Sequence, residues 1–258
     1  MPGNRMGLTR VRRTLRRIWK LTRLLRRREF RRGLRFGVAA SLESLPALNG
    51  LKVATVIDVG ANVGQFSLLM TALQPEAAVH AFEPLASSAS VLSRLFAGNP
   101  RVQVHRCAVG AGNGEAILHI SRRADNSSLL PIGAGQLRFA PGTDAVAAVP
   151  VPVRTLDSEI MAEGLARPVL LKLDVQGGEL AALEGAGRLL SVVEHVYVEV
   201  SFTPLYDGQP LAAAIVGHLQ ACGFVLAGIG GCSSGRDGRI VQADLLLSRP
   251  SPPGAQPS

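Results

Sequence analysis

An acidic residue and two glycines interrupt an apolar stretch, VIDVGANVGQFSLLM, at residues 56–70. Asp58 stands where a β-branched run should end as a strand, Gly60 allows a sharp turn and close approach of a ligand, and Gly64 opens the next apolar segment. Ligands of open parallel sheets bind at the carboxyl ends of the strands. The spacing is D-x-G-x-x-x-G, with Asn62 where a dinucleotide-binding G-x-G-x-x-G turn has its second glycine. An acidic residue at this turn suits a cationic ligand better than a pyrophosphate.

A second carboxylate follows the next apolar run, VHAFEP, in which Glu83 stands at the end of an expected strand. A carboxylate at that position can accept both hydroxyl groups of a ribose, in S-adenosylmethionine as well as in NAD. The alternative is a surface or capping glutamate before a proline. Because S-adenosylmethionine carries an ammonium and a sulfonium group and no phosphate, it fits the first turn better.

The stretch LLKLDVQGGEL, residues 170–180, carries two charged residues that are two positions apart. On a strand, Lys172 and Asp174 therefore point to the same face, while Leu171 and Leu173 point to the other. Asp174 would lie at the carboxyl end of its strand, beside the first turn. The amine-methylating motif D/N-P-P-Y/F is not found in this stretch, which disfavours methylation of a nucleobase nitrogen.

The elements that must position these residues alternate between strands and helices from residue 51 onward. This alternation predicts right-handed βαβ units and a largely parallel sheet covered on both faces. The polar, Gly-rich segment 121–148 is long enough to be a functional loop. We expect strands at 53–59, 77–82, 102–109, 116–120, 169–173, 195–200, 224–228 and 240–247, an isolated extended stretch at 149–153, and helices at 64–73, 85–96, 179–190 and 211–222.

Composition indicates a folded globular protein, with 47% hydrophobic and 18% charged residues in 258. The three cysteines, Cys107, Cys222 and Cys232, form no C-x-x-C pair, which favours a reducing compartment and no structural zinc. The apolar runs are too short to span a bilayer, and the N-terminus lacks a signal-peptide pattern. We therefore expect a cytoplasmic protein with no metal site.

Basic residues are concentrated at the N-terminus, where residues 1–36 hold 14 Arg or Lys and one acid, Glu29. The remaining chain carries 14 basic and 18 acidic residues. Residues Leu8, Val11, Leu15, Ile18 and Leu25 fall on one stripe of a helix. Such a helix, within residues 5–36, could bind an anionic membrane surface at the inner face of the membrane, pack on its own domain, or belong to a transit peptide. Nucleic acid is disfavoured, because aromatic residues are not interleaved with the arginines.

We accordingly expect three parts. Residues 1–44 form a basic amphipathic helical segment, residues 45–248 form the main domain, and residues 249–258, rich in Pro and Ser, form a disordered tail.

Several motifs occur in the same order as in a known family. They are IDVGANVGQFS (57–67), AFEP (81–84), AVGAGNGEA (108–116), SSL (127–129), VRTLDS (153–158), LLKLDVQGGEL (170–180), VEV (198–200) and YDGQP (206–210). With these motifs, the chain resembles the FkbM-type methyltransferases, which use S-adenosylmethionine. The resemblance implies a Rossmann-like, doubly wound α/β fold with a seven-stranded sheet, mostly parallel with an antiparallel last strand.

The resemblance also implies site residues. Asp58, Gly60, Asn62 and Gly64 match the cofactor turn, Glu83 matches the ribose acid, and the strand end at Ala108 falls where adenine usually rests. Methylation of a hydroxyl on a sugar, glycolipid or other small-molecule acceptor is the usual reaction. One departure is Gly178, where alanine is common, and the loop after Ile120 has no clear counterpart.

A sugar hydroxyl is a poor nucleophile while it is protonated, so a base within hydrogen-bonding reach assists its methylation. We expect Asp174 to be that base and Glu199 to be the second choice, with Lys172 orienting Asp174 or pairing with Glu199. The two carboxylates could instead bind sugar hydroxyls or a cation, and Asp174 could simply cap the next helix. Loop residues that could contact the acceptor are Arg122, Arg123, Asn126, Ser127, Tyr206 and Asp207.

Two other functions fit part of this pattern. A nucleotide-dependent oxidoreductase would share Glu83, although the glycine spacing disfavours it. A non-catalytic cofactor-binding protein with a basic membrane- or nucleic-acid-binding arm would bind the cofactor without turnover.

Overall fold

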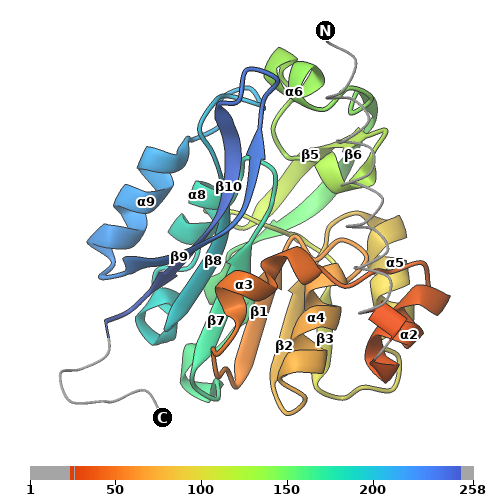
Figure 1. Ribbon diagram of the computed structural model, residues 1–258, viewed down its shortest axis with the longest axis vertical. Coiled ribbons are helices and arrows are strands. Elements are labelled where there is room, and N and C mark those ends of the chain that lie inside the picture. Colours follow the sequence, from red (N-terminus) through yellow and green to blue (C-terminus); the bar gives the residue numbers. More distant parts are fainter. Residues whose placement is uncertain (1–23, 26, 251–258) are drawn as a thin grey trace, which may run out of the picture.

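A seven-stranded sheet forms the centre of the molecule in the computed structural model, which describes residues 24, 25 and 27–250. The strand order is β3-β2-β1-β7-β8-β10-β9 (Figure 1). Neighbours pair in parallel from β3 to β8, whereas β10, the last strand of the chain, is antiparallel to both β8 and β9. The predicted fold class is thus confirmed. The strands are β1 (Thr55–Val59), β2 (Ala78–Phe82), β3 (Val102–His105), β7 (Val169–Leu173), β8 (His195–Ser201), β9 (Val225–Ser234) and β10 (Ile240–Ser248).

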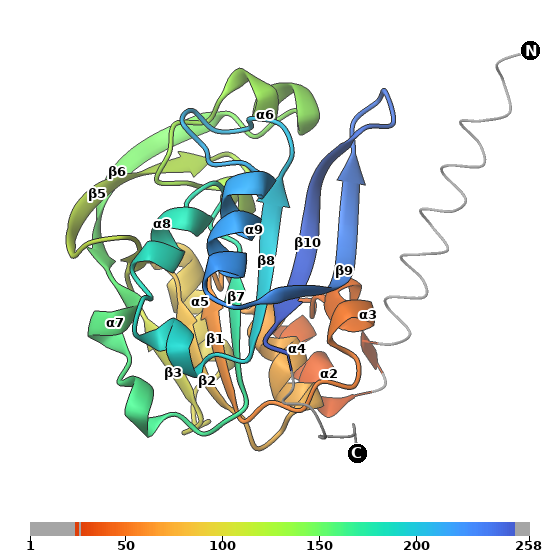
Figure 2. The same cartoon turned by 90° about the vertical axis from the view of Figure 1, so that its left-hand side faces the viewer.

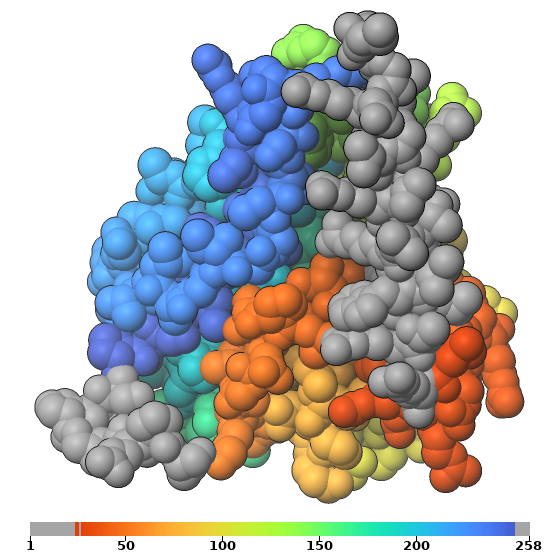
Figure 3. All heavy atoms as spheres, viewed as in Figure 1, coloured from red at the N-terminus to blue at the C-terminus, as the bar shows by residue number. Residues whose placement is uncertain are grey.

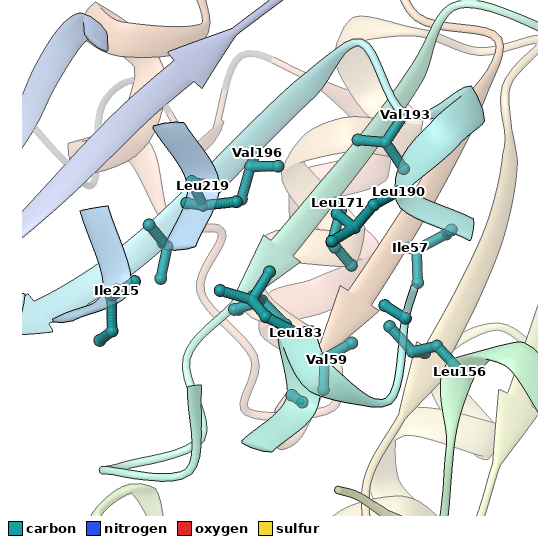
Figure 4. Close-up of a cluster of buried hydrophobic side chains, with 14 of the residues drawn as sticks. Ile57, Val59, Leu156, Leu171, Leu183, Leu190, Val193, Val196, Ile215 and Leu219 are labelled. Atoms are coloured by element: carbon teal, nitrogen blue, oxygen red, sulfur yellow. The ribbon is translucent and has the colours of Figure 1, made fainter. Parts of the chain in front are cut away.

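Helices cover both faces of this sheet, as Figure 2 shows from the side. One face carries α7 (Leu156–Glu159), α8 (Glu179–Glu184), η4 (Leu189–Val192) and α9 (Ala212–Ala221). The other carries α2 (Arg28–Arg35), η1 (Leu42–Ser44), α3 (Leu45–Leu48), α4 (Gln65–Leu73) and α5 (Ala86–Leu95). Figure 4 shows the first core, where strand residues meet helix residues: Val196 lies beside Leu219, and Leu171 lies beside Leu190.

The twofold period of the strands places polar residues on the second face, toward α4. Ile57 and Val59 of β1 join the core under α8, so Asp58 between them points to the other face. Leu171 and Leu173 place Lys172 on the same side as Asp58. The register then sets Asp58 directly beside Lys172 on the neighbouring strand.

A second, three-stranded sheet lies beside the first, and it corrects two predictions. The expected single strand at 102–109 is split, because β3 ends at His105 and β4 (Ala108–Val109) pairs with β6 (Ala145–Arg154) instead. The stretch 149–153 is not isolated, since it belongs to β6, which also pairs with β5 (Gly114–Ser121). The predicted loop 121–148 contains η2 (Ala124–Asn126), α6 (Ala134–Phe139) and the start of β6.

The described part of the basic N-terminal segment packs on the main domain. Phe30 of α2 is buried in the same core as Leu68 of α4, and the Arg32 guanidinium donates to the carbonyl of Ala97 at 3.0 Å. In the space-filling view, the orange α3 lies against the blue β9–β10 pair (Figure 3). The boundary expected after residue 44 therefore does not fall at a break in the packing.

Several predictions concern residues that the structure does not describe. The apolar stripe from Leu8 to Ile18 and residues 251–258 of the predicted tail 249–258 lie outside the described residues. Arg249, the first residue of that tail, is ordered and donates to the carbonyl oxygens of Leu190, Val193 and Cys222. Within residues 24, 25 and 27–250, no helix is long and apolar enough to cross a membrane.

The β1–α4 turn touches the end of β7 at Gly60. Gly60 has a φ of +76°, and a Cβ atom there would overlap the carbonyl oxygen of Asp174. Gly64 has a φ of +98°, and a Cβ there would lie 2.7 Å from Leu92 of α5. Both glycines are therefore needed, the first to bring the turn onto β7 and the second to pack α4 against α5.

The contact at Gly60 can be separated from its backbone conformation. Gly98 has a similar φ of +80° but nothing within 4 Å of the added Cβ. We expect Gly98→Ala to lower the free energy of unfolding by about 1–2 kcal/mol, the ordinary cost of a left-handed residue. Gly60→Ala should cost about 4 kcal/mol or more, because β7 must also move. Denaturant unfolding of both variants measures this, and equal losses would refute the close contact.

Candidate active site

A cavity of about 380 Å³ lies at the carboxyl edge of the seven-stranded sheet, where the strand order reverses between β1 and β7. This is where open α/β sheets bind ligands, and the volume is within the roughly 300–1,000 Å³ of small-molecule sites. On one side the wall consists of the turn after β1 and the ends of β2 and β4. On the other side it consists of the end of β7 with β8 and β10, and residues 124–129 also line the cavity.

Lys172 occupies the point where these two sides meet. Its ammonium lies 3.0 Å from Asp58 Oδ1 and donates to the carbonyl oxygens of Gly60 at 2.8 Å and Val59 at 3.2 Å. Asp174 Oδ2 lies 3.9 Å away on the cavity side. Burial alone would lower the pKa of Lys172, but the Asp58 and Asp174 carboxylates raise the pKa above its ordinary value. The side chain is therefore a fixed cation that ties β1 and its turn to β7.

Asp58 is placed differently from the expectation that its carboxylate faces a cationic ligand. The residue is fully buried, does not line the cavity, and accepts a 2.6 Å hydrogen bond from the Ser67 hydroxyl on its second oxygen. Both oxygens of Asp58 are thus used within the protein. Its observed role is to hold Lys172 and the first turn of α4.

Glu83 lies just behind the cavity wall, between the lining residues Phe82 and Pro84. Its carboxylate accepts backbone hydrogen bonds from Asn62 and from Leu85, each at 2.8 Å. Burial raises the pKa of Glu83 to about 7, against the opposing effect of these two bonds. Asn62 itself lines the cavity with a φ of +49°, so Glu83 braces the turn that forms the wall.

The rest of this half of the cavity is largely apolar. Ala108 and Val109 of β4 line it together with Phe82 and Leu118. Cys107 also lines it, and burial raises the pKa of this thiol to about 11. A flat aromatic ring is the kind of group that such a wall accommodates. Ala108, which was expected to lie beside the adenine, is thus part of this apolar wall because β4 ends at the cavity.

The opposite half of the cavity is acidic. Asp174, Glu199 and Asp244 line it from β7, β8 and β10, and Asp244 lies directly beside Glu199 in the register. The pKa of Glu199 is raised well above its ordinary value, mainly by burial and to a smaller extent by the negative charges of Asp174, Asp244 and Glu179. Burial also raises the pKa of Asp244 to about 6. Within the described part of the chain, no group of three or more metal-binding side chains is arranged to hold an ion.

Glu179 does not reach the cavity. Its buried carboxylate accepts hydrogen bonds from the backbone amides of Val175, at 3.0 Å, and of Gly177, at 3.0 and 3.1 Å. Burial raises the pKa of Glu179 to about 7. The residue thus closes the turn between β7 and α8, which sets the path of the lining residues between them.

The loop residues considered as acceptor contacts separate into two groups. Asn126 and Ser127 line the cavity, whereas Arg122 and Arg123 do not and lie near the acids Asp144, at 3.9 Å, and Asp125, at 3.7 Å. Tyr206 is buried behind the lining, and Asp207 is exposed. The two arginines are therefore not placed to bind a phosphate inside the cavity.

The lining residues that were not predicted from the sequence include Phe66, Gln176, Tyr197 and Asp244. Phe66 and Tyr197 stack, with ring centroids 5.9 Å apart, under the acidic half. A signal for Tyr197 and Asp244 was available, since each lies on a strand face shared with Glu199. Gln176 follows Asp174 by two residues, but its contacts depend on a turn whose path the sequence does not reveal.

The buried ion pair makes a stability prediction. Lys172→Met should lower the free energy of unfolding by about 3–5 kcal/mol, because Asp58 is left charged and buried without its partner. The double variant Asp58→Asn/Lys172→Met should regain about 2 kcal/mol or more of that loss. Chemical denaturation of the unmodified protein, of both single variants and of the double variant measures the coupling, and strictly additive losses would contradict it.

Comparison with known protein sequences finds methyltransferases. The family model described as "Methyltransferase FkbM domain" matches residues 58–226. The methyltransferase sdnD of Sordaria araneosa is 32% identical over 173 residues, which cover 56% of this chain and 65% of sdnD. The 2-O-methyltransferase NoeI of Sinorhizobium fredii is 26% identical over 167 residues, which cover 62% of this chain and 69% of NoeI. The chain thus spans about two-thirds of the length of these relatives.

Among solved structures, the magnesium protoporphyrin IX methyltransferase (ChlM) from Synechocystis PCC 6803 with bound SAM is similar at a TM-score of 0.40. Its sequence identity is 16%, with 80% of this chain and 74% of that chain covered. A likeness this weak supports no inference about the site. The family match, in contrast, extends over more than half of the chain and includes the cavity wall from the β1 turn to Glu199. This chain belongs to the FkbM methyltransferase family.

Proposed function

We propose that the protein transfers a methyl group from S-adenosylmethionine to a hydroxyl group of a sugar, glycolipid or related natural product. One observation carries the proposal: a single cavity joins a half-apolar wall beside a glycine turn to an acidic wall that contains Asp174. Such a cavity can hold a nucleoside donor on one side and a hydroxyl-bearing acceptor on the other. The family membership of the chain supports the methyl-transfer part.

The residues present fit S-adenosylmethionine. The apolar wall at Ala108 and Val109 suits adenine, and Glu83 lies at the end of β2, where a ribose would be bound. Each oxygen of Glu83 accepts one backbone hydrogen bond and keeps a second lone pair for a hydroxyl. Gly60 and Asn62 form the wall nearest the methionine part, and the acids of the opposite wall favour its positive charge.

When bound, S-adenosylmethionine supplies a methyl group on a positively charged sulfur. The protein must then hold the acceptor oxygen in line with that methyl group, which contributes about 7–11 kcal/mol in well-oriented reactions. Asp174 is the best-placed base, because its side chain is 41% exposed and lines the cavity. The Asp174 carboxylate lies 3.9 Å from the Lys172 ammonium and is the group that can take the proton of the acceptor hydroxyl.

A hydroxyl acceptor is favoured over other classes by two features. The acids Asp174 and Glu199 and the amide of Asn126 offer hydrogen-bonding groups suited to a polyol. The name of NoeI, a 2-O-methyltransferase, is in line with this choice. The family match argues against the alternative of an oxidoreductase. A non-catalytic cofactor-binding protein would differ from an enzyme in showing no turnover.

The reaction itself can be tested with methyl-labelled S-adenosylmethionine and a cellular extract of lipids and glycans. We expect the label to appear in a glycan or lipid product, as a methyl ether that is stable to acid hydrolysis. Asp174→Asn should reduce the rate about 100-fold or more while the cofactor still binds, since only the base is removed. The matched control, Asp237→Asn, alters an exposed acid in the β9–β10 hairpin and should keep full activity. Full activity of Asp174→Asn would reject the base, and cofactor binding without any labelled product would favour the non-catalytic alternative.

The pKa of Glu83 predicts how cofactor affinity depends on pH. A ribose that donates to Glu83 prefers the ionised carboxylate, whereas near pH 6 this group is mostly protonated because its pKa is about 7. Affinity should therefore rise about tenfold between pH 6 and pH 8, as the carboxylate loses its proton. Calorimetric titration of S-adenosylmethionine measures this rise.

Glu83→Gln separates this effect from titration of the cofactor and of other acids. The variant should bind more weakly at pH 8 and should lose the part of the pH dependence that Glu83 supplies. The same pH dependence in both proteins would show that Glu83 does not bind the ribose.

A further inference from the structure

Gln176 contacts both acids that line the acceptor half of the cavity. Its side-chain amide nitrogen donates to Asp174 Oδ1 at 2.8 Å and to Glu199 Oε2 at 3.1 Å. The two hydrogens of one amide are thus directed to two carboxyl groups from different strands. Among the described residues, no other side chain donates a hydrogen bond to both acids.

The orientation of this amide is set from its other end. The Tyr206 hydroxyl donates to Gln176 Oε1 at 2.7 Å, which directs the amide nitrogen toward the carboxyl groups. The reverse orientation would place the amide oxygen against two acids, which repel it. Tyr206 is itself fully buried, so this anchor is held rigidly.

The backbone of Gln176 is also fixed. Its φ is +56°, which is unusual for a residue other than glycine, and the Ser128 hydroxyl donates to its carbonyl oxygen at 2.7 Å. Ser128 belongs to the segment 124–129 that lines the cavity. The left-handed turn therefore turns the Gln176 side chain back toward Asp174, two residues earlier, and links it to the cavity wall.

We propose that Gln176 is a positioning residue whose side-chain amide holds the carboxyl groups of Asp174 and Glu199 together as one unit at the acceptor end of the cavity. Its effect on methyl transfer rests on the proposed function. The coupling of the two carboxyl groups does not, because it belongs to the protein without any ligand.

The electrostatic surroundings of the pair give this arrangement a measurable consequence. Glu199 faces Asp174 at the end of β7, Asp244 on β10 and Glu179 on α8, with Lys172 as the opposing cation. An N–H group that donates to a carboxylate stabilises the ionised form. Removing the Gln176 amide therefore takes one such donor from each of the two carboxyl groups.

Gln242 provides a matched control. Its amide also donates to Glu199 Oε2, at 2.8 Å, but not to Asp174. Gln176→Met and Gln242→Met therefore remove the same chemical group from the same oxygen of Glu199. Only the first also removes a donor from Asp174.

The experiment is a pH titration of the side-chain carboxyl carbons by NMR, with the full chain and no cofactor or acceptor. In Gln176→Met, the midpoints of both Asp174 and Glu199 should rise by about one pH unit. In Gln242→Met, Glu199 should shift by a similar amount and Asp174 by much less. Assignment uses the Asp174→Asn and Glu199→Gln spectra.

A residue that only closed the turn would leave the Asp174 midpoint unchanged, and that result would overturn the proposal. Equal shifts of Asp174 in the two variants would overturn it as well. Should Gln176→Met fail to fold, Tyr206→Phe keeps the ring and removes the hydroxyl that donates to Gln176 Oε1 at 2.7 Å, together with its longer 3.2 Å contact to the carbonyl oxygen of Asn126. This variant should raise the midpoints of both Asp174 and Glu199 by a smaller amount than Gln176→Met does. Unchanged midpoints in that variant would equally overturn the proposal.

The same variants give a second readout once the acceptor is known. Gln176→Met should reduce kcat about 10- to 100-fold, as expected for a misplaced reacting group, and should shift the acid limb of the pH–kcat profile upward. Cofactor affinity should stay unchanged. Failure of the proposed function would remove this readout only, since the titration of the carboxyl groups requires no turnover.

Discussion

The ammonium group of Lys172 is the interaction on which the rest of the site depends. It is buried between two strands and bound to the carboxylate of Asp58 in β1, to the carbonyl oxygens of Val59 and Gly60 and, more distantly, to Asp174. A buried ammonium is costly unless several acceptors surround it, so these groups must stay together. The position of the turn relative to the end of β7 is therefore determined by charge as well as by packing.

This constraint explains how one cavity can serve two reactants. The turn with Gly60 rests on the carbonyl of Asp174, so the largely apolar half and the acidic half of the cavity meet without an intervening layer of side chains. A donor held by the turn is then adjacent to an acceptor held by the acids. Proximity of this kind is the main requirement of an in-line methyl transfer. The acids near that point also favour a positively charged donor.

Much of the main sheet could be predicted, because its signals are local. The strand at Val169–Leu173 is a short apolar run with clear breakers, and Lys172 and Asp174 follow from the twofold period. The second sheet could not be predicted, since a run from Val102 to Val109 shows no sign that the chain changes sheets near Arg106. Its pairing with β6 depends on residues more than 40 positions away.

The edge of the sheet at which the cavity lies could be predicted from the sequence, whereas the contacts of individual side chains could not. Asp58 was expected to face the ligand, but its alternating neighbours direct it into the core, where Lys172 and Ser67 bind it. The identity of Lys172 as its partner requires the strand order, which only the fold provides. Gln176 was missed because its role depends on a left-handed backbone conformation and on Tyr206, 30 residues later in the chain.

The most direct test of this account is a crystal structure of the protein with S-adenosylhomocysteine, the product of the donor. The account predicts the ligand at the edge between β1 and β7, with adenine against Ala108, ribose at Glu83 and sulfur facing Asp174. A ligand bound elsewhere, or a cavity closed by the protein's own side chains in the presence of saturating ligand, would contradict it.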